Sequence, residues 1–380
     1  MGLIIGIDAS RNRSGGALAH LIGILSQCDP IKYDIKEVHI WSYRSLLDQL
    51  PEFPWLIKHN PLSLERNLLK QIMWQAISFE KELKSAHCDI LFSTSGSSFC
   101  LFKPMVTLSQ DMLSYEPGVM SYFGYGAFRL RLQCILILQN LAFRRSQGVI
   151  FLSRYAGKVI QKSCGRLVNI AFIPHGVDEV FRKVQSMYPW PEDEERPINC
   201  IYVSNMDMYK HQWQVIEAIS TLRARGHKIT LKLVGGGTSA AEKLVKNAIE
   251  SSHEKGSFIE RVEFIAHKEI PALLSESDIF IFASSCENMP VTLIEGMAIG
   301  LPIACSDRGP MPEVLGDGGV YFDPNDYLSI ANAIEKILSS SDLRSSISKQ
   351  AQLLSLRYNW KMCSDDTFEY ILSVYNENNS

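Results

Sequence analysis

The segment "SSCENMPVTLIEGMAIGLP", residues 284–302, joins a strand-like run to a helix and so indicates the class of fold. After Asp278, the run "IFIFA" immediately before it is apolar throughout, as buried strands are. Pro290 suits the first helical position and Gly300 suits the end of the helix. This layout points the free amides of the helix at the carboxyl end of the strand, which favours an anion there. Two glutamates, Glu287 and Glu295, lie at the same junction.

Each of these glutamates has two interpretations. An ionised carboxylate at Glu295, one turn into the helix, can accept hydrogen bonds from both hydroxyls of a ribose. Glu287, in the preceding loop, lies close to where a sugar would hang from the phosphates. The alternative is that both are ordinary residues, one favoured by the helix dipole and one placed in a turn.

Apolar runs of strand length alternate with helical patterns along the whole chain. Such strands, separated by helices, are typical of parallel sheets covered on both faces, so the alternation predicts an α/β fold. The segment 183–197 has three prolines and a cluster of acids, and it is predicted to link two doubly wound domains. Ligands would lie at the carboxyl ends of the strands, in a cleft that the two domains face. The predicted strands are 3–9, 37–42, 89–94, 106–111, 148–153, 170–176, 198–204, 229–235, 261–266, 278–284, 302–307 and 320–324.

Composition narrows the class of protein. With 46% hydrophobic and 21% charged residues among 380, the chain is predicted to be globular, and it is long enough for two domains. The nine cysteines form no C-x-x-C pair, which argues against a zinc framework or a disulfide scaffold. The opening "LIIGIDAS" is predicted to be a core strand, not a signal peptide, and the apolar stretch 134–143 is too short to span a bilayer.

Charge is distributed unevenly along the chain. Residues 1–176 contain 19 Lys and Arg against 12 Asp and Glu, or +7, and the remainder contains 19 against 29, or −10. Residues 117–177 contain no acidic residue. This segment either has solvated helix faces or is held against an anionic partner, such as phospholipid headgroups or a pyrophosphate-linked substrate. The favoured interpretation of 128–145 is a core helix, and the alternative is a helix lying on a membrane.

Other residues at strand ends have less specific signals. Lys210, after the first strand of the second domain, could neutralise charge on a departing diphosphate, or it could be a solvated lysine. The glycines of Ser14-Gly15-Gly16 allow close approach to phosphate or sugar, though a tight turn explains them equally well. The sequence lacks a P-loop and a complete G-x-G-x-x-G, and its histidines have no metal-ligand spacing.

Taken together, these residues resemble the retaining glycosyltransferases of family 4, which have the GT-B fold of two Rossmann-like domains. Glu287 and Glu295 resemble the E-x7-E signature of that family. The resemblance covers most of the chain and is densest over 204–324. The segments that carry it are "GMAIGLPIACSDRGPMPEVLGDGGVYFDP" (296–324), "FIPHGVD" (172–178), "FLSRYAGKVI" (151–160), "YKHQ" (209–212) and "RYNWKMC" (357–363), where the closing helix would return to the first domain.

The resemblance implies a role for each matching position. Glu295 would hold the nucleotide ribose, Glu287 the donor sugar, and Lys210 would stabilise the leaving nucleoside diphosphate. Further donor contacts would come from Asn288, Met289, Val291 and Thr292, mainly through the backbone, with Gly15 and Gly16 at the junction of donor and acceptor.

Two positions depart from the family pattern. Asn205 stands where the family usually has an arginine, so the leaving group would depend on the lysine alone or on an arginine from elsewhere, such as Arg182 or Arg308. Gln110 stands where a histidine usually contacts the sugar, whereas the neighbouring Asp111, a candidate catalytic residue, is retained.

The implied function is retaining transfer of a hexose from a UDP- or GDP-sugar, with a slight preference for GDP-mannose. The acceptor would be a lipid-pyrophosphate-linked or oligosaccharide hydroxyl in bacterial surface-polysaccharide assembly (O-antigen, capsule or exopolysaccharide). No metal or other cofactor and no nucleic-acid partner is expected. The acceptor-side domain would be 1–181 with the closing helix 357–380, and the donor-binding domain 182–356. The expected location is the cytoplasm, including the inner face of the plasma membrane.

Three other functions use the same kind of fold. A non-catalytic sugar-nucleotide-binding subunit of an assembly complex is favoured by the departures at Asn205 and Gln110. A nucleotide-sugar epimerase would need further acidic residues and histidines in the cleft, and a phosphorylase would need a pyridoxal phosphate lysine in a longer chain.

Overall fold

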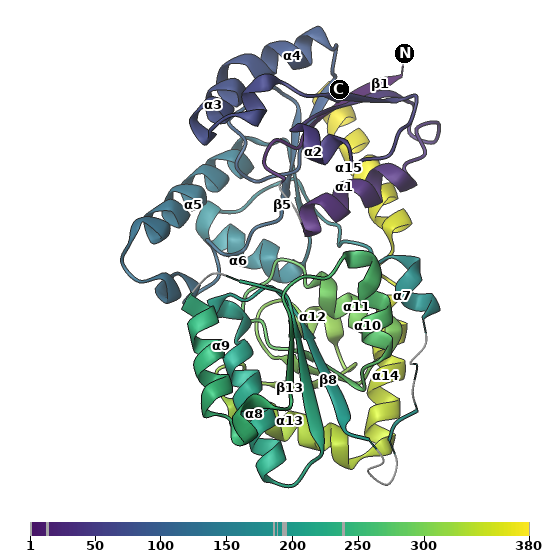
Figure 1. The fold of residues 1–380 in the computed structure, drawn as a ribbon. Coiled ribbons are helices and arrows are strands. Elements are labelled where there is room, and N and C mark those ends of the chain that lie inside the picture. Colours follow the sequence, from purple (N-terminus) through teal and green to yellow (C-terminus); the bar gives the residue numbers. More distant parts are fainter. Residues whose placement is uncertain are drawn as a thin grey trace. The chain divides into compact units, whose positions relative to one another are not determined.

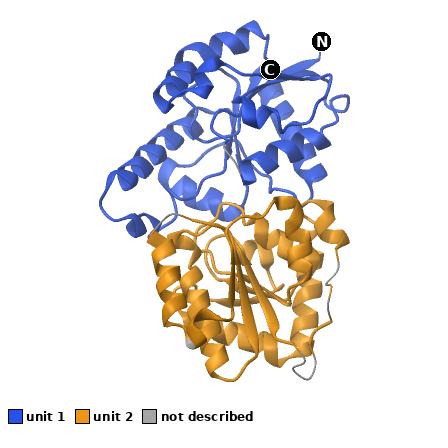
Figure 2. Cartoon of the chain, viewed as in Figure 1, with its two compact units in different colours: residues 1–176, 358–380 blue, residues 177–357 orange. Residues whose placement is uncertain are grey.

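The computed structural model describes residues 2–12, 15–184, 187, 189–191, 196–237 and 240–379, apart from the side chain of residue 253. The chain forms two compact units (Figure 2). The first consists of Met1–Gly176 with Tyr358–Ser380, and the second of Val177–Arg357. Residues 185, 186, 188 and 192–195 of the predicted linker lie outside the described residues, as do Ser14, Thr238 and Ser239.

The described part of the first unit contains a seven-stranded parallel sheet with the order β3-β2-β1-β4-β5-β6-β7. Its central strands are buried on both faces because nearly every side chain in them is apolar or small. The strands are β1 (Leu3–Asp8), β2 (Ile35–Trp41), β3 (Leu56–His59), β4 (Ile90–Ser93), β5 (Met105–Ser109), β6 (Gly148–Phe151) and β7 (Ile170–Phe172).

Helices cover this sheet, and the last helix of the chain returns to it. Ser364 in that helix donates from Oγ to the carbonyl oxygen of Ile24 in α1 at 2.7 Å, and the two helices lie side by side (Figure 1). The α-helices are α1 (Gly16–Gln27), α2 (Arg44–Leu47), α3 (Leu68–Met73), α4 (Phe79–Ser85), α5 (Ala127–Arg145), α6 (Arg154–Cys164) and α15 (Trp360–Asn379). A π-helical turn, Trp74–Ser78, joins α3 to α4.

The second unit repeats the design with a six-stranded parallel sheet among its described residues, in the order β10-β9-β8-β11-β12-β13. The strands are β8 (Ile198–Val203), β9 (Ile229–Val234), β10 (Ile259–Val262), β11 (Ile279–Phe282), β12 (Ile303–Ser306) and β13 (Val320–Phe322). The α-helices are α7 (Glu179–Lys183), α8 (Gln212–Ala224), α9 (Ala240–Ser251), α10 (Ile270–Ser275), α11 (Val291–Ile299), α12 (Met311–Leu315), α13 (Tyr327–Ser339) and α14 (Ser341–Ser355).

The chain crosses between the units after Gly176, earlier than the sequence predicts. The reason is α7, which packs on α11 with Phe181 fully buried and therefore belongs to the second unit. The two parallel α/β sheets confirm the predicted fold class. Strand β3 was not predicted, because Lys58 and His59 interrupt its apolar pattern.

Two further details differ from the sequence predictions. Helix α11 starts at Val291, so Pro290 is its N-cap and not its first residue, whereas Gly300 ends the helix as predicted, with φ 86°. Helix α5 is not the core helix that the sequence favoured, because its buried side chains are only Leu132, Gln139, Ala142 and Phe143.

Candidate active site

The junction of β11 and α11 buries a carboxylate. The interior of α11 from Leu293 to Ile299 is buried because the helix is apolar almost all round, and Glu295 lies within this run with its side chain only 3% exposed. Its Oε1 accepts a hydrogen bond from His267 Nε2 at 2.7 Å. Its Oε2 is buried and has no hydrogen-bond partner among the described residues. One oxygen of a buried carboxylate is therefore left to accept a hydrogen bond from a ligand.

His267 and Glu295 influence each other's protonation. Burial raises the pKa of Glu295, and the hydrogen bond from His267 opposes that rise. The same hydrogen bond raises the pKa of His267, whose side chain is about half exposed. His267 comes from the turn His267–Glu269 that follows β10, where its ring also packs 5.6 Å from that of Phe181. The sequence gives no signal for this role, because the histidine lies 28 residues from Glu295.

The second predicted glutamate forms an ion pair with the predicted lysine. Lys210 Nζ donates to Glu287 Oε1, and both side chains are about 15% exposed. Lys210 ends the turn Met208–Lys210 after β8, which Asp207 caps by accepting from the amide of Met208 at 2.7 Å. Tyr202 fixes this turn further, because its hydroxyl donates to the carbonyl of Lys210 at 2.8 Å. Lys210 follows β8 and Glu287 follows β11, and their ion pair brings the two charges together at the carboxyl ends of these strands.

A histidine ties these two strand ends together. His211 Nε2 lies 2.8 Å from Ser285 Oγ, and the amide of Ser285 donates to the carbonyl of Tyr209 at 2.8 Å. Burial lowers the pKa of His211 to about 4, so its ring is neutral at pH 7. The sequence offers one signal for this role, which is that His211 directly follows Lys210 at a strand end.

The remaining predicted donor contacts lie along the loop and the first turn of α11. Asn288 and Met289 are buried. Val291 and Thr292 are the first residues of α11, and the amide of Val291 donates to the carbonyl of Met289 at 3.0 Å. Asn205 follows β8, and its carbonyl accepts from Gln212 Nε2 at 2.9 Å.

The two arginines considered as substitutes for Asn205 are both in ion pairs. Arg182 bonds Glu179 at 2.9 Å, and Arg308 bonds Asp323 at 2.7 Å. Arg308 lies in the loop that approaches the ion-paired glutamate, because a Cβ atom placed on Gly309 would be 4.0 Å from the amide nitrogen of Glu287. Burial is the main cause of the lowered pKa of His211, and the positive charge of Arg308 lowers that pKa further.

The first unit positions its predicted residues at strand ends as well. Gly15, directly before α1, has a φ of 66°. Gly16 begins that helix, and a Cβ atom placed on it would lie 4.0 Å from the ring of His175. Asp111 follows β5, accepts from the amide of Leu113 at 2.9 Å, and has its pKa raised by burial. Gln110 Nε2 is buried without a partner among the described residues.

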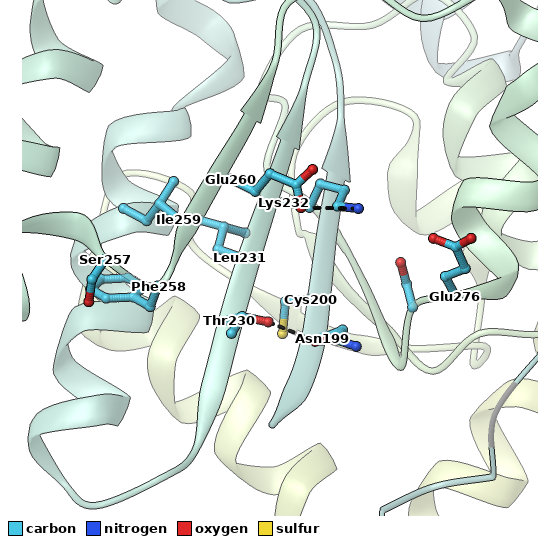
Figure 3. Close-up of a pocket in the computed structure, with 11 residues that line it drawn as sticks. Asn199, Cys200, Thr230, Leu231, Lys232, Ser257, Phe258, Ile259, Glu260 and Glu276 are labelled. Atoms are coloured by element: carbon cyan, nitrogen blue, oxygen red, sulfur yellow. Dashed lines mark hydrogen bonds and ion pairs between the residues drawn. The ribbon is translucent and has the colours of Figure 1, made fainter. Parts of the chain in front are cut away.

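A cavity of about 520 Å³ in the second unit lies apart from this candidate site (Figure 3). Residues of β8, β9 and β10 line it. Among them Lys232 forms an ion pair with Glu260 at 3.1 Å, and Thr230 Oγ1 donates to Asn199 Oδ1 at 2.8 Å. None of its described lining residues belongs to the candidate site. The residues that line it are Asn199, Cys200, Thr230, Leu231, Lys232, Ser257, Phe258, Ile259, Glu260, Glu276 and Ser277.

The described residues form neither a metal-ligand cluster nor a membrane-spanning helix. That part of the chain contains no group of three or more His, Cys, Asp or Glu side chains that could hold a metal ion. It also contains no helix that is long and apolar enough to cross a membrane.

Two parallel-sheet units with charged side chains at the strand ends define a GT-B fold, and solved structures agree. Sucrose-phosphate synthase from Thermosynechococcus elongatus superimposes with a TM-score of 0.77 at 15% identity, covering 99% of this chain and 100% of that one. Anabaena HepE, in complex with UDP-glucose, gives 0.71 at 20% identity over 98% and 100%.

The sequence comparisons identify the family. Residues 188–354 match the family model described as "Glycosyl transferases group 1". The O-antigen chain mannosyltransferase B of Escherichia coli is 22% identical over 167 residues, which is 44% of this chain and 44% of that relative. The matched region thus spans less than half the length of that relative. Residues 188–354 therefore match the group 1 glycosyltransferases, in agreement with the resemblance to family 4 in the sequence.

Proposed function

We propose that this chain transfers a hexose from a nucleotide sugar to a hydroxyl group, with retention of the anomeric configuration. The observation that carries the proposal is the buried carboxylate of Glu295, which has one oxygen without a partner among the described residues. A buried oxygen without a hydrogen-bond partner does not stabilise the fold, whereas a ribose hydroxyl could donate a hydrogen bond to it. The second unit binds the donor in this proposal, and the first unit presents the acceptor.

The ion pair of Lys210 with Glu287 acts on the departing nucleoside diphosphate in this proposal. Breaking the bond between the anomeric carbon and the diphosphate oxygen leaves the electron pair on the nucleoside diphosphate, while the acceptor oxygen bonds to the carbon and its proton passes to the diphosphate. Lys210 neutralises the growing charge, and we assign Arg308 as the second cation, since its loop adjoins Glu287. Glu287 holds Lys210 in place and contacts the sugar, together with the loop at Asn288.

The residues of the first unit are assigned to the acceptor and the sugar in this proposal. Gly15 and Gly16 leave room for the substrates at the start of α1, and Asp111 lies at the end of β5 with its pKa raised by burial. A carboxyl with a raised pKa at a strand end is a candidate for contacts with the acceptor hydroxyl. Gln110, next to it, would contact the donor sugar through its amide.

The substrates are the finer part of the proposal. A lipid-pyrophosphate-linked or oligosaccharide acceptor of surface-polysaccharide assembly is supported by the similarity to the Escherichia coli relative, which is an O-antigen chain mannosyltransferase. The same relative favours GDP-mannose, and the HepE complex keeps UDP-glucose open as a donor. We place the reaction in the cytoplasm, at the inner face of the plasma membrane where a lipid-linked acceptor would be met.

A panel of UDP- and GDP-sugars tests the proposal by thermal shift on the whole chain. A ligand that binds only the folded state at about 100 times its Kd adds roughly 2.7 kcal/mol of stability. One donor should stabilise the wild type and fail with Glu295→Ala and with Lys210→Ala. Glu260→Ala, in the separate cavity, is the matched control and should respond like the wild type. Equal stabilisation of all four proteins would contradict the assigned site.

A non-catalytic sugar-nucleotide-binding subunit is the second candidate function. It is favoured by Asn205 and Gln110, which stand where the family usually has an arginine and a histidine. Donor hydrolysis separates the two candidates, because a transferase should release free sugar slowly without acceptor and a pure binder should release none. Loss of that release in Lys210→Ala would assign it to this site.

A further inference from the structure

Helix α5 has two apolar faces, and the described residues cover only one of them. Its buried face packs toward α6. At 100° per residue the opposite side of the helix gathers a second apolar stripe within an arc of about 60°. The stripe consists of Leu130, Cys134, Ile137 and Leu141, of which the three aliphatic side chains are 62%, 56% and 50% exposed. Neither a soluble core nor a solvated surface explains so regular an exposed stripe.

An aromatic side chain extends the apolar surface at the amino end of α5. Tyr125, two residues before the helix, is 97% exposed, and the guanidinium of Arg129 lies 4.6 Å from the centroid of its ring. Exposed aromatic rings beside an arginine are typical of segments at the boundary between lipid and water.

Cations border the stripe on both sides. On the helical projection Arg131 and Arg145 fall on one margin and Arg144 on the other. The side chain of Arg144 donates to the carbonyl of Cys164 at the end of α6, and that of Arg145 donates to the carbonyls of Leu141 and Ser98, so Arg131 is the cation of this margin that the charge-reversal test uses. Helix α6 adds further exposed cations at Lys158 and Lys162, and α5 itself runs along the outside of the first unit (Figure 1). No acidic residue lies between 117 and 177 to neutralise this field.

We propose that α5 is the surface by which this chain lies on a membrane that contains anionic phospholipids. An apolar stripe with cations on its margins is the pattern of a helix that lies in the plane of the interface. The stripe enters the acyl boundary, and the arginines meet the headgroup phosphates. This goes beyond sugar transfer, because it concerns where the enzyme works and can be tested without any sugar.

Vesicle binding of the full-length chain tests the inference. The wild type should co-sediment with vesicles of phosphatidylcholine and phosphatidylglycerol, not with phosphatidylcholine alone, and binding should weaken as salt is raised. Ile137→Gln with Leu141→Gln should weaken binding at least ten-fold, because two aliphatic anchors are lost. Arg131→Glu should weaken it by ten-fold or more, since about five-fold is lost per cation and a like charge is added.

Matched variants outside α5 control for general effects. Leu353→Gln removes a leucine that is 62% exposed on α14, and Lys246→Glu reverses an exposed charge on α9; both should bind like the wild type. All variants change exposed side chains, so their thermal midpoints should match the wild type.

Two results would overturn the inference. The first is vesicle binding that does not change with lipid charge, with salt concentration or in the α5 variants. A dimer of the lipid-free chain that Ile137→Gln with Leu141→Gln dissociates is the other, because it would assign the stripe to a second copy. Donor binding by thermal shift should be unchanged in every α5 variant, so failure here is distinguishable from failure of the proposed function.

Discussion

Replacing His175 by phenylalanine should make the first unit resistant to mild acid. The His175 ring stacks on that of His20 at 4.7 Å between ring centroids, packs beside Trp360, and is 3% exposed. Neither ring nitrogen of either histidine has a hydrogen-bond partner among the described residues. Burial lowers the pKa of His175 to about 4 and that of His20 well below its ordinary value. A proton on His175 would also face the positive end of α1, which begins at Gly16.

The size of the effect follows from the difference in pKa. The unfolded chain binds a proton at His175 near the ordinary pKa of about 6.5, and the folded chain binds it only near 4. The stability that the neutral ring contributes is therefore present above about pH 6.5 and is lost as the pH falls. At about 1.4 kcal/mol per pH unit, the loss is roughly 2 kcal/mol at about pH 5 and roughly 3 kcal/mol below about pH 4. His20 adds to the loss with the same sign.

Urea unfolding measures this loss, with pulsed hydrogen exchange in peptides of α1 and α15 to report on the first unit. Between about pH 7 and pH 5 the wild type should lose at least 2 kcal/mol of unfolding free energy, to which both histidines contribute. His175→Phe should lose roughly 2 kcal/mol less, while the control His227→Asn, at a partly exposed histidine, should behave like the wild type. Equal acid sensitivity in the wild type and His175→Phe would refute the reasoning, because it would mean that His175 is protonated in the folded state.

Three predictions concern the second unit. Lys210→Met should destabilise it by roughly 3 kcal/mol in urea unfolding, because Glu287 is left without its charge partner, and adding Glu287→Gln should recover most of the loss. His267→Gln should move the acid limit of donor binding to higher pH, because it removes the hydrogen bond that opposes the raised pKa of Glu295; equal weakening at every pH would indicate a structural effect only. Glu295→Met should abolish the donor-induced thermal shift yet stabilise the donor-free chain by about 1 kcal/mol, and a less stable donor-free variant would contradict a ligand-facing role for the unpartnered oxygen.

The strands could be predicted because burial on both faces leaves a local signature. Runs such as Ile279–Phe282 are apolar at every position, and twelve runs that are wholly or mostly apolar predicted twelve of the strands. Strand β3 escaped because an edge strand needs less burial; its Lys58 donates from Nζ to the carbonyl of Leu50 at 2.9 Å. For α5 the sequence left two interpretations open, a core helix and a helix on a membrane, since an apolar stripe looks the same in sequence whether or not another element covers it.

Side-chain partners were harder to predict than positions. Glu287 and Lys210 were each identified from their places at strand ends, but they are 77 residues apart, and only the sheet order brings β8 beside β11 and so joins them. The same holds for the partner of Glu295, His267, which depends on where the turn after β10 meets α11. Spacing predicts which edge of a sheet a residue occupies, whereas the pairing across that edge is set by topology and packing.

The cost of burying Glu295 explains why this position is informative in both sequence and structure. A methionine or leucine would pack in the interior of α11 without desolvating a charge, so local stability favours an apolar residue there. The histidine from the following turn satisfies one oxygen only, and the burial that remains uncompensated raises the pKa of the carboxyl. A buried carboxylate that destabilises its own helix in this way is best explained by a ligand that completes its hydrogen bonds. The same reasoning does not extend to the ion pair of Lys210 with Glu287, whose charges already satisfy each other, so the unpartnered oxygen at Glu295 is the stronger evidence for a bound nucleotide.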